Sequence, residues 1–114
     1  MVKSAGRRGR IDPRVYYRDK TVLITGAGSG LGRALALEAG TRGARIYASD
    51  ADLRAAEETR LLLTEEKSDA LCTPLRLDVT DTDDFDRAFA EIEREYGGLD
   101  ILINNAGQCI VGES

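Results

Sequence analysis

Apolar runs of strand length alternate along the chain with longer stretches in which apolar residues recur at helical spacing. The runs that predict β-strands lie at residues 21–25, 45–49, 71–79 and 99–104. The stretches that predict α-helices lie at residues 30–42, 52–66 and 80–96. Strands that are separated by helices pair in parallel through right-handed crossovers. The pattern therefore predicts one α/β domain with a doubly wound parallel sheet, truncated after the fourth strand.

Individual residues refine the positions and the ends of these elements. Residues 21–25 are apolar on both faces, which is typical of a buried parallel strand. Pro74 cannot donate a hydrogen bond to a neighbouring strand, so it favours an edge position for the third strand. We expect Gly43 to cap the first helix at its C-terminus. We also expect Thr80 and Asp83 to form a capping box at the start of the third helix.

The composition fits a single small domain. The 114 residues are 42% hydrophobic and 32% charged. No apolar run approaches the roughly 20 residues of a membrane span, so we expect no membrane partner. Two cysteines, Cys72 and Cys109, do not make a disulfide framework and no secretory leader is recognisable, which favours a cytoplasmic location. The chain has no histidine, which argues against a zinc site or a Ser-His-Asp triad, and we predict no metal site.

Charge divides the chain into two parts. Residues 1–20 hold seven of the 16 basic residues but only two of the 20 acidic ones. Such an arm is compatible with an acidic partner or with organellar targeting, but its shortness and lack of an amphipathic period favour a solvated leader. The acidic remainder disfavours nucleic-acid binding. We predict a basic arm over residues 1–19, a domain over residues 20–114, and no nucleic-acid partner.

The segment from Thr25 to Gly32 carries the most informative chemistry. It reads Thr-Gly-Ala-Gly-Ser-Gly-Leu-Gly, follows a predicted strand and opens a predicted helix. Free N–H groups at a helix N-terminus favour an anion, and glycines let the backbone approach a pyrophosphate. A turn that merely requires positive φ is the alternative. Against it, Asp50 ends the second strand 18 residues after Gly32, where a carboxylate can accept both hydroxyls of an adenosine ribose. The predicted cofactor-binding residues of this turn are Gly26, Ser29, Gly30, Leu31 and Gly32.

These residues resemble the classical short-chain dehydrogenase/reductase family. Its pattern Thr-Gly-x-x-x-Gly-x-Gly is met at residues 25–32, and its Asn-Asn-Ala-Gly motif is met at residues 104–107. The family also has an aspartate after the third strand that contacts adenine, and Asp78 stands at that position. The resemblance covers about residues 20–110 and implies a Rossmann-like sheet in the order 3-2-1-4. The cofactor-binding residues that it adds are Asp78, Val79, Asn105, Ala106 and Gly107.

The resemblance implies an oxidoreductase that moves a hydride between a nicotinamide cofactor and an alcohol or carbonyl substrate. NADP-preferring relatives often carry a basic residue at the position of Ser29, and Asp50 would repel a 2′-phosphate. We therefore expect NAD in preference to NADP. Arg33 and Arg54 are interpreted as solvated helix residues.

The family's catalytic Ser and Tyr-x-x-x-Lys pair lie well downstream of the Asn-Asn-Ala-Gly motif, and this chain has no residues that match them there. Tyr16 and Lys20 have the Tyr-x-x-x-Lys spacing but precede the first predicted strand. Cys109 has no base to activate it and is interpreted as a loop thiol. We assign no catalytic residue.

Two functions stay open. The first is the cofactor half of an NAD-dependent enzyme, whose small-molecule substrate would bind only in a full-length form. The second is a non-catalytic dinucleotide-binding module. A methyltransferase is disfavoured by the match at residues 25–32 and 104–107. The unpaired edge at residues 101–103 also predicts self-association.

Overall fold

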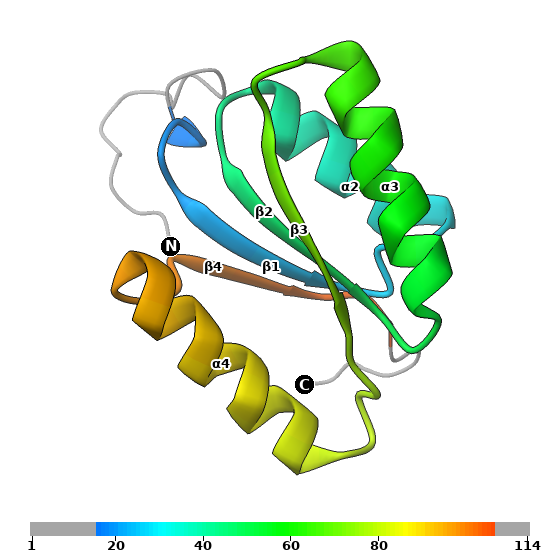
Figure 1. The fold of residues 1–114 in the computed structure, drawn as a ribbon, viewed down its shortest axis with the longest axis vertical. Coiled ribbons are helices and arrows are strands. Elements are labelled where there is room, and N and C mark those ends of the chain that lie inside the picture. The colour runs from blue at the N-terminus through cyan, green and yellow to red at the C-terminus, as the bar shows by residue number, and fades with distance from the viewer. Residues whose placement is uncertain (1–15, 107–114) are drawn as a thin grey trace, which may run out of the picture.

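A computed structural model describes residues 16–106 of the chain as a four-stranded sheet with three helices (Figure 1). The strands pair in parallel in the order β3-β2-β1-β4, which confirms the predicted order 3-2-1-4. The strands are β1 (Thr21–Thr25), β2 (Arg45–Asp50), β3 (Leu71–Arg76) and β4 (Ile101–Asn104). The helices are α2 (Gly30–Thr41), α3 (Leu53–Glu66) and α4 (Thr82–Tyr96).

The sheet is a central layer between helices, with α2 and α3 on one face and α4 on the other (Figure 1). Alternate residues of β1 enter the two cores. Val22 and Ile24 pack with the α2–α3 side, and Leu23 packs with the α4 side. All three side chains are fully buried, and each such burial contributes about 1.5–3 kcal/mol. The run of apolar residues in β1 therefore reflects a strand that is covered on both faces.

The structure confirms some of the expected element boundaries and corrects others. Pro74 lies in the edge strand β3, as predicted, but β3 ends at Arg76 rather than at residue 79. The expected capping box is wrong, because Asp81 is the N-cap of α4 and accepts the backbone N–H of Asp83. The hydroxyl of Thr80 instead donates to Asp78. A carboxylate that is one residue closer to the helix provides the cap.

The C-terminal half of α2 packs unusually closely on α3. Arg42 is the C-cap, and Gly43 follows it with a φ of +100°. Gly40 is buried, and a Cβ on it would lie 2.4 Å from Leu63 Cδ2. Any side chain at position 40 would therefore require the Leu63 side chain to move.

The structure does not describe residues 1–15 or 107–114, which include most of the predicted arm, Gly107 and Cys109. Within residues 16–106, no helix has both the length and the apolar character that crossing a membrane requires.

Candidate functional site

A cleft of about 380 Å³ lies where the carboxyl ends of β1, β2 and β4 meet. Parallel strands of an open α/β sheet bind their ligands at this edge. The cleft is lined by Gly26, Ser29, Asp50, Ala51, Leu77, Asp78, Val79, Asn105 and Ala106. Seven of these nine residues are among those predicted from the sequence. These seven come from four separate segments of the chain.

Three further predicted residues, Gly30, Leu31 and Gly32, form the start of α2 beside the cleft. Gly30 has a φ of +55°, and the side chain of Leu31 is 65% exposed. A Cβ on Gly32 would lie 2.0 Å from the carbonyl oxygen of Gly26, which itself has a φ of +66°. The glycines at 26 and 32 therefore let the turn fold back directly onto the first turn of the helix.

The N-terminus of α2 is free of the side-chain caps that close the other two helices. Ser29 is its N-cap and makes no side-chain capping hydrogen bond, and its first turn holds no acidic residue. In contrast, Asp52 caps α3 and Asp81 caps α4. The first amides of a helix have no partner within the helix, so those of α2 are available to an anion in the cleft.

Asp50, at the end of β2, joins the glycine turn to the start of α3. Its Oδ2 accepts the backbone N–H of Gly28 at 2.9 Å, and its Oδ1 accepts that of Asp52 at 3.0 Å. A carboxylate oxygen has two acceptor sites, so each oxygen keeps capacity for one more donor. The residue is half-buried at the cleft wall, and it therefore has both a structural role and room to bind a hydroxyl.

The hydroxyl of Thr25 organises the other side of the cleft. Thr25 is 1% exposed, donates to Asn104 Oδ1 at 2.8 Å, and accepts the backbone N–H groups of Asn105 and Ala106 at 2.9 and 3.1 Å. Asn105 Nδ2 donates to the Gly26 carbonyl oxygen at 3.3 Å. The sequence singled out Thr25 only as a member of the glycine pattern, and the hydroxyl residue directly before Gly26 was the signal for this role.

Asp78 lies in a tight turn after β3. Its Oδ1 accepts the N–H and the hydroxyl of Thr80 at 2.9 and 2.7 Å, and these hydrogen bonds lower the pKa of its carboxyl. Its own N–H donates to Asp84 Oδ2 at 2.9 Å. That bond is the main cause of the lowered pKa of Asp84, to which Arg87 and Arg76 add. Sequence reasoning did not identify the bond between Asp84 and the Asp78 backbone.

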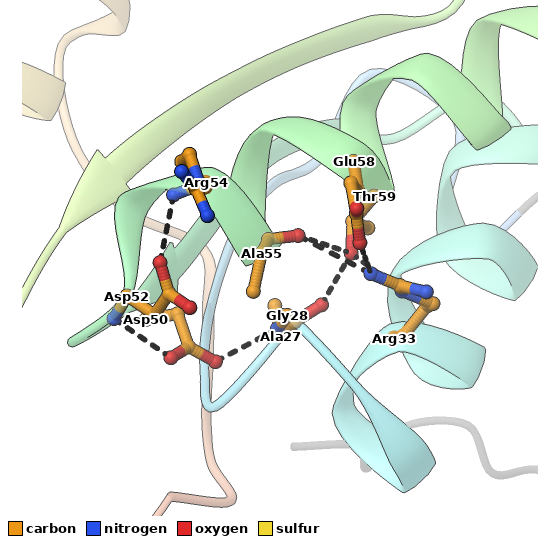
Figure 2. A network of polar contacts seen from close by, with 9 residues as sticks. All are labelled: Ala27, Gly28, Arg33, Asp50, Asp52, Arg54, Ala55, Glu58 and Thr59. Carbon is orange, nitrogen blue, oxygen red and sulfur yellow. Dashed lines mark hydrogen bonds and ion pairs between the residues drawn. The ribbon is translucent and has the colours of Figure 1, made fainter.

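The interpretation of Arg33 as a solvated residue is wrong. Its Nε donates to Thr59 Oγ1 at 3.0 Å, and its Nη2 donates to Glu58 at 3.1 Å and to the Ala55 carbonyl at 3.3 Å (Figure 2). Arg33 therefore links α2 to α3, because the buried Thr59 hydroxyl, the Ala55 carbonyl and the exposed Glu58 carboxylate accept from its guanidinium. Arg54 is exposed, as expected.

Other features of the described residues lie away from this cleft. Tyr16 and Lys20 precede β1 and so stand at its amino end, with the Lys20 ammonium 5.5 Å from the Tyr16 ring centroid. A larger cavity of about 610 Å³ also lies at that end, and its lining includes Arg18, Gly43 and Lys67 but no predicted site residue. Within residues 16–106, no three His, Cys, Asp or Glu side chains are grouped to hold a metal ion.

Residues 20–114 match the family model described as short chain dehydrogenase. The chain is 41% identical over 96 residues to "Probable oxidoreductase EphD" of Mycobacterium tuberculosis (strain ATCC 25618 / H37Rv), a match that covers 83% of this chain and 16% of that protein. It is 44% identical over 87 residues to "Sorbitol dehydrogenase" of Cereibacter sphaeroides, covering 76% of this chain and 32% of that protein.

Solved structures share the fold. The crystal structure of a hydroxysteroid dehydrogenase from Escherichia coli superposes with a TM-score of 0.76 and 28% sequence identity, over 83% of this chain and 40% of that one. A short chain dehydrogenase from Bacillus anthracis str. 'Ames Ancestor' matches with a TM-score of 0.73 and 33% identity, over 80% of this chain and 36% of that one. The matched part of the chain thus covers between 16% and 40% of each of these proteins.

Proposed function

This chain belongs to the short chain dehydrogenase family, and from that premise we propose that it forms the dinucleotide-binding part of an oxidoreductase. The reaction would move a hydride between a nicotinamide cofactor and an alcohol or carbonyl substrate. The observation that carries the proposal is the meeting of the glycine turn, Asp50 and residues 105–106 around one cleft. A non-catalytic dinucleotide-binding module is the second candidate. The Tyr16–Lys20 pair has the spacing of the family's catalytic pair but stands at the amino end of β1, away from the cleft. It therefore could not act on a cofactor bound there, which favours this second candidate.

The residues of the cleft fit a dinucleotide. Gly26 and Gly32 permit the close turn, because a Cβ on either would meet the protein itself, and a Cβ on Gly30 would meet nothing within 4 Å. The uncapped start of α2 offers donors and a partial positive charge to a pyrophosphate. In this proposal Asp50 accepts the adenosine ribose hydroxyls, and Asp78 with Val79 borders the adenine. Asn105, Ala106 and Gly107 border the remainder of the cofactor. When bound, the nicotinamide supplies the hydride acceptor or donor.

The roles that we assign to the chain are binding and orientation. The turn and the start of α2 hold the pyrophosphate, while the Thr25 hydroxyl fixes residues 104–106 beside it. We assign proton transfer to none of residues 16–106.

We further propose that NAD is preferred to NADP. A 2′-phosphate on the adenosine ribose would lie against the Asp50 carboxylate, and like charges at close range repel. Within residues 16–106, no Lys or Arg forms an ion pair with Asp50, and Arg33 is already engaged by Glu58. Ser29, at the mouth of the cleft, brings no positive charge.

Two further proposals concern the setting in which the chain works. We propose a cytoplasmic location, supported by Cys72, a free thiol within the described residues.

We also propose that β4 associates with a second copy of the chain. β4 pairs with β1 on one side, forms the end of the sheet, and carries Leu102 with 44% of its surface exposed.

A titration with NADH tests the proposed function, because the fluorescence of the nicotinamide reports on binding without requiring turnover. The proposal expects saturable binding that is lost in Gly32→Val, where a side chain would meet the Gly26 carbonyl. Oxidation of secondary alcohols by NAD, followed as NADH absorbance, then separates the two candidates. Alcohol oxidation that co-purifies with the chain would favour the oxidoreductase, whereas cofactor binding without oxidation would favour the non-catalytic module.

A further inference from the structure

One peptide group of the glycine turn, between Ala27 and Gly28, is held at both of its polar atoms by side chains (Figure 2). Its N–H, on Gly28, donates to Asp50 Oδ2 at 2.9 Å, and its carbonyl oxygen, on Ala27, accepts from Thr59 Oγ1 at 2.6 Å. The N–H of Ala27 is bound as well, to the carbonyl of Ser49 at 2.9 Å. The middle of the turn is therefore fixed by β2 on one side and by α3 on the other.

The hydroxyl of Thr59 is aimed at this peptide by Arg33. It accepts from Arg33 Nε at 3.0 Å and has one proton to donate. That proton goes to Ala27, because the Ala27 carbonyl oxygen is at 2.6 Å and the Ala55 carbonyl oxygen is at 3.3 Å. A hydroxyl that accepts from a guanidinium is polarised and donates more strongly. Arg33 is itself held by Glu58 at 3.1 Å. A series of hydrogen bonds therefore runs from Glu58 through Arg33 and Thr59 to the turn.

The surroundings of Thr59 place it out of direct reach of the cleft. Thr59 and Ala27 are both fully buried, and Thr59 is not among the residues that line the cleft. Valine would fill the same volume at this buried position but would carry no hydroxyl. Besides accepting from Arg33, its hydroxyl binds the carbonyl of a turn from a different part of the chain.

We propose that Thr59, aimed by Arg33, is a positioning residue for dinucleotide binding. The Thr59 hydroxyl holds the Ala27–Gly28 peptide in place, so that the turn and the first amides of α2 face the cleft before a pyrophosphate arrives. A preorganised site avoids the cost of ordering the turn on binding. This inference rests on the proposed function, since it assumes that a pyrophosphate binds at the turn.

The test uses the 114-residue chain, four single variants, and the double variant that combines Thr59→Val with Arg33→Met. Thr59→Val removes the hydroxyl at nearly constant volume, and Thr59→Ser keeps it. Thr64→Val is the matched control, because Thr64 lies on the same helix and its hydroxyl donates only to carbonyls of α3. Arg33→Met removes the aiming group. ADP-ribose, which contains the pyrophosphate without the nicotinamide, is the ligand, and its dissociation constant is measured by calorimetry. NMR hydrogen exchange of the Gly28 amide, compared with that of Leu23 in the sheet, reports on the turn without a ligand.

We expect Thr59→Val to weaken ADP-ribose binding roughly three- to tenfold, the effect of one lost hydrogen bond. The exchange of Gly28 should rise more than that of Leu23. Thr59→Ser and Thr64→Val should resemble the wild type. Arg33→Met should weaken binding in the wild type but add little to Thr59→Val, because both act on one bond.

Three results would overturn the inference. In the first, Thr59→Val binds ADP-ribose as the wild type does. In the second, Thr59→Ser is as weak as Thr59→Val. In the third, Gly28 and Leu23 exchange faster by the same factor, which marks a general loss of stability. A wild-type chain that binds neither ADP-ribose nor NAD would instead overturn the proposed function, and this inference with it.

Discussion

Thr25 and Asn104 stand 79 positions apart in the sequence, and a hydrogen bond of 2.8 Å from the Thr25 hydroxyl to Asn104 Oδ1 joins them. The same hydroxyl accepts the next two backbone N–H groups, so one oxygen fixes the chain where it leaves β4. The position of residues 105 and 106 in the cleft therefore depends on a side chain at the end of β1.

Thr25→Val should destabilise the chain by about 1–3 kcal/mol, because it leaves the two N–H groups and Asn104 Oδ1 without their partner. Urea unfolding followed by circular dichroism measures this change. Thr25→Ser keeps the hydroxyl and should cost less. Thr41→Val is the control, since Thr41 Oγ1 donates only to the Glu38 carbonyl on the surface of α2. An equal loss in Thr25→Val and Thr41→Val would contradict this account of Thr25.

Asp50→Ala combined with Ser29→Arg should shift the cofactor preference toward NADP. The change removes the charge that repels a 2′-phosphate and adds a cation at the mouth of the cleft. Because Asp50 also binds the N–H of Gly28, the double variant should lose some affinity for both cofactors. Asp50→Asn removes the charge but keeps an oxygen for that bond, so it separates the loss of charge from the loss of the hydrogen bond. Dissociation constants for NAD and NADP give the ratio, and an unchanged ratio would count against the role of Asp50.

Asp84 should make the stability of the chain depend on pH in the acid range. The N–H of Asp78 and the Arg87 guanidinium lower the pKa of Asp84 below its ordinary value of 3.8. Its stabilising effect is therefore complete above the unfolded-state pKa and is lost as the pH falls through the lower folded-state pKa. Urea midpoints measured on both sides of pH 3.8 should show the wild type losing its advantage over Asp84→Asn as the pH falls. The exposed Asp86→Asn is the control, and a difference that does not change with pH would contradict the prediction.

Leu102→Lys should reduce self-association of the chain. The substitution places a charge on the end strand β4, where Leu102 is exposed and no strand among residues 16–106 pairs with the outer edge. Light scattering across a range of protein concentrations measures the change. Leu61→Lys, at a 52% exposed position on α3, is the control and should leave association unchanged. A wild-type chain that stays monomeric, with strong amide protection at residues 101–103, would refute the proposal.

The order of the elements, the glycine turn and Asp50 could be predicted because their signals are local, whereas the sheet order and residues 78, 79, 105 and 106 were implied by the family resemblance. A strand, a glycine turn and a helix follow one another directly at residues 21–41, and Asp50 ends the next strand. Parallel pairing of β1 with β2 and β4, in the order that the resemblance implies, then brings their carboxyl ends together.

Features that depend on contacts between distant residues could not be predicted in this way. The sequence gives no reason for Gly40 inside a helix, because the reason is Leu63 of another helix. Arg33 has the sequence context of a solvated residue, and its partners Glu58 and Thr59 become apparent only when α2 packs on α3. The same is true of the bond between Asp84 and the Asp78 backbone, because the sequence does not specify the shape of the turn between them.

The most direct test of the account is a map of where NAD binds, obtained from the backbone amide shifts of the ¹⁵N-labelled chain as NAD is added. The account predicts saturable shifts concentrated at residues 26–32, at Asp50, at residues 78–79 and at residues 105–106. Amides near Gly43 and Lys67, which line the larger cavity at the opposite end of the sheet, should stay unchanged. Shifts confined to that second cavity, or no saturable shifts at all, would contradict the assignment of the glycine turn as a dinucleotide site.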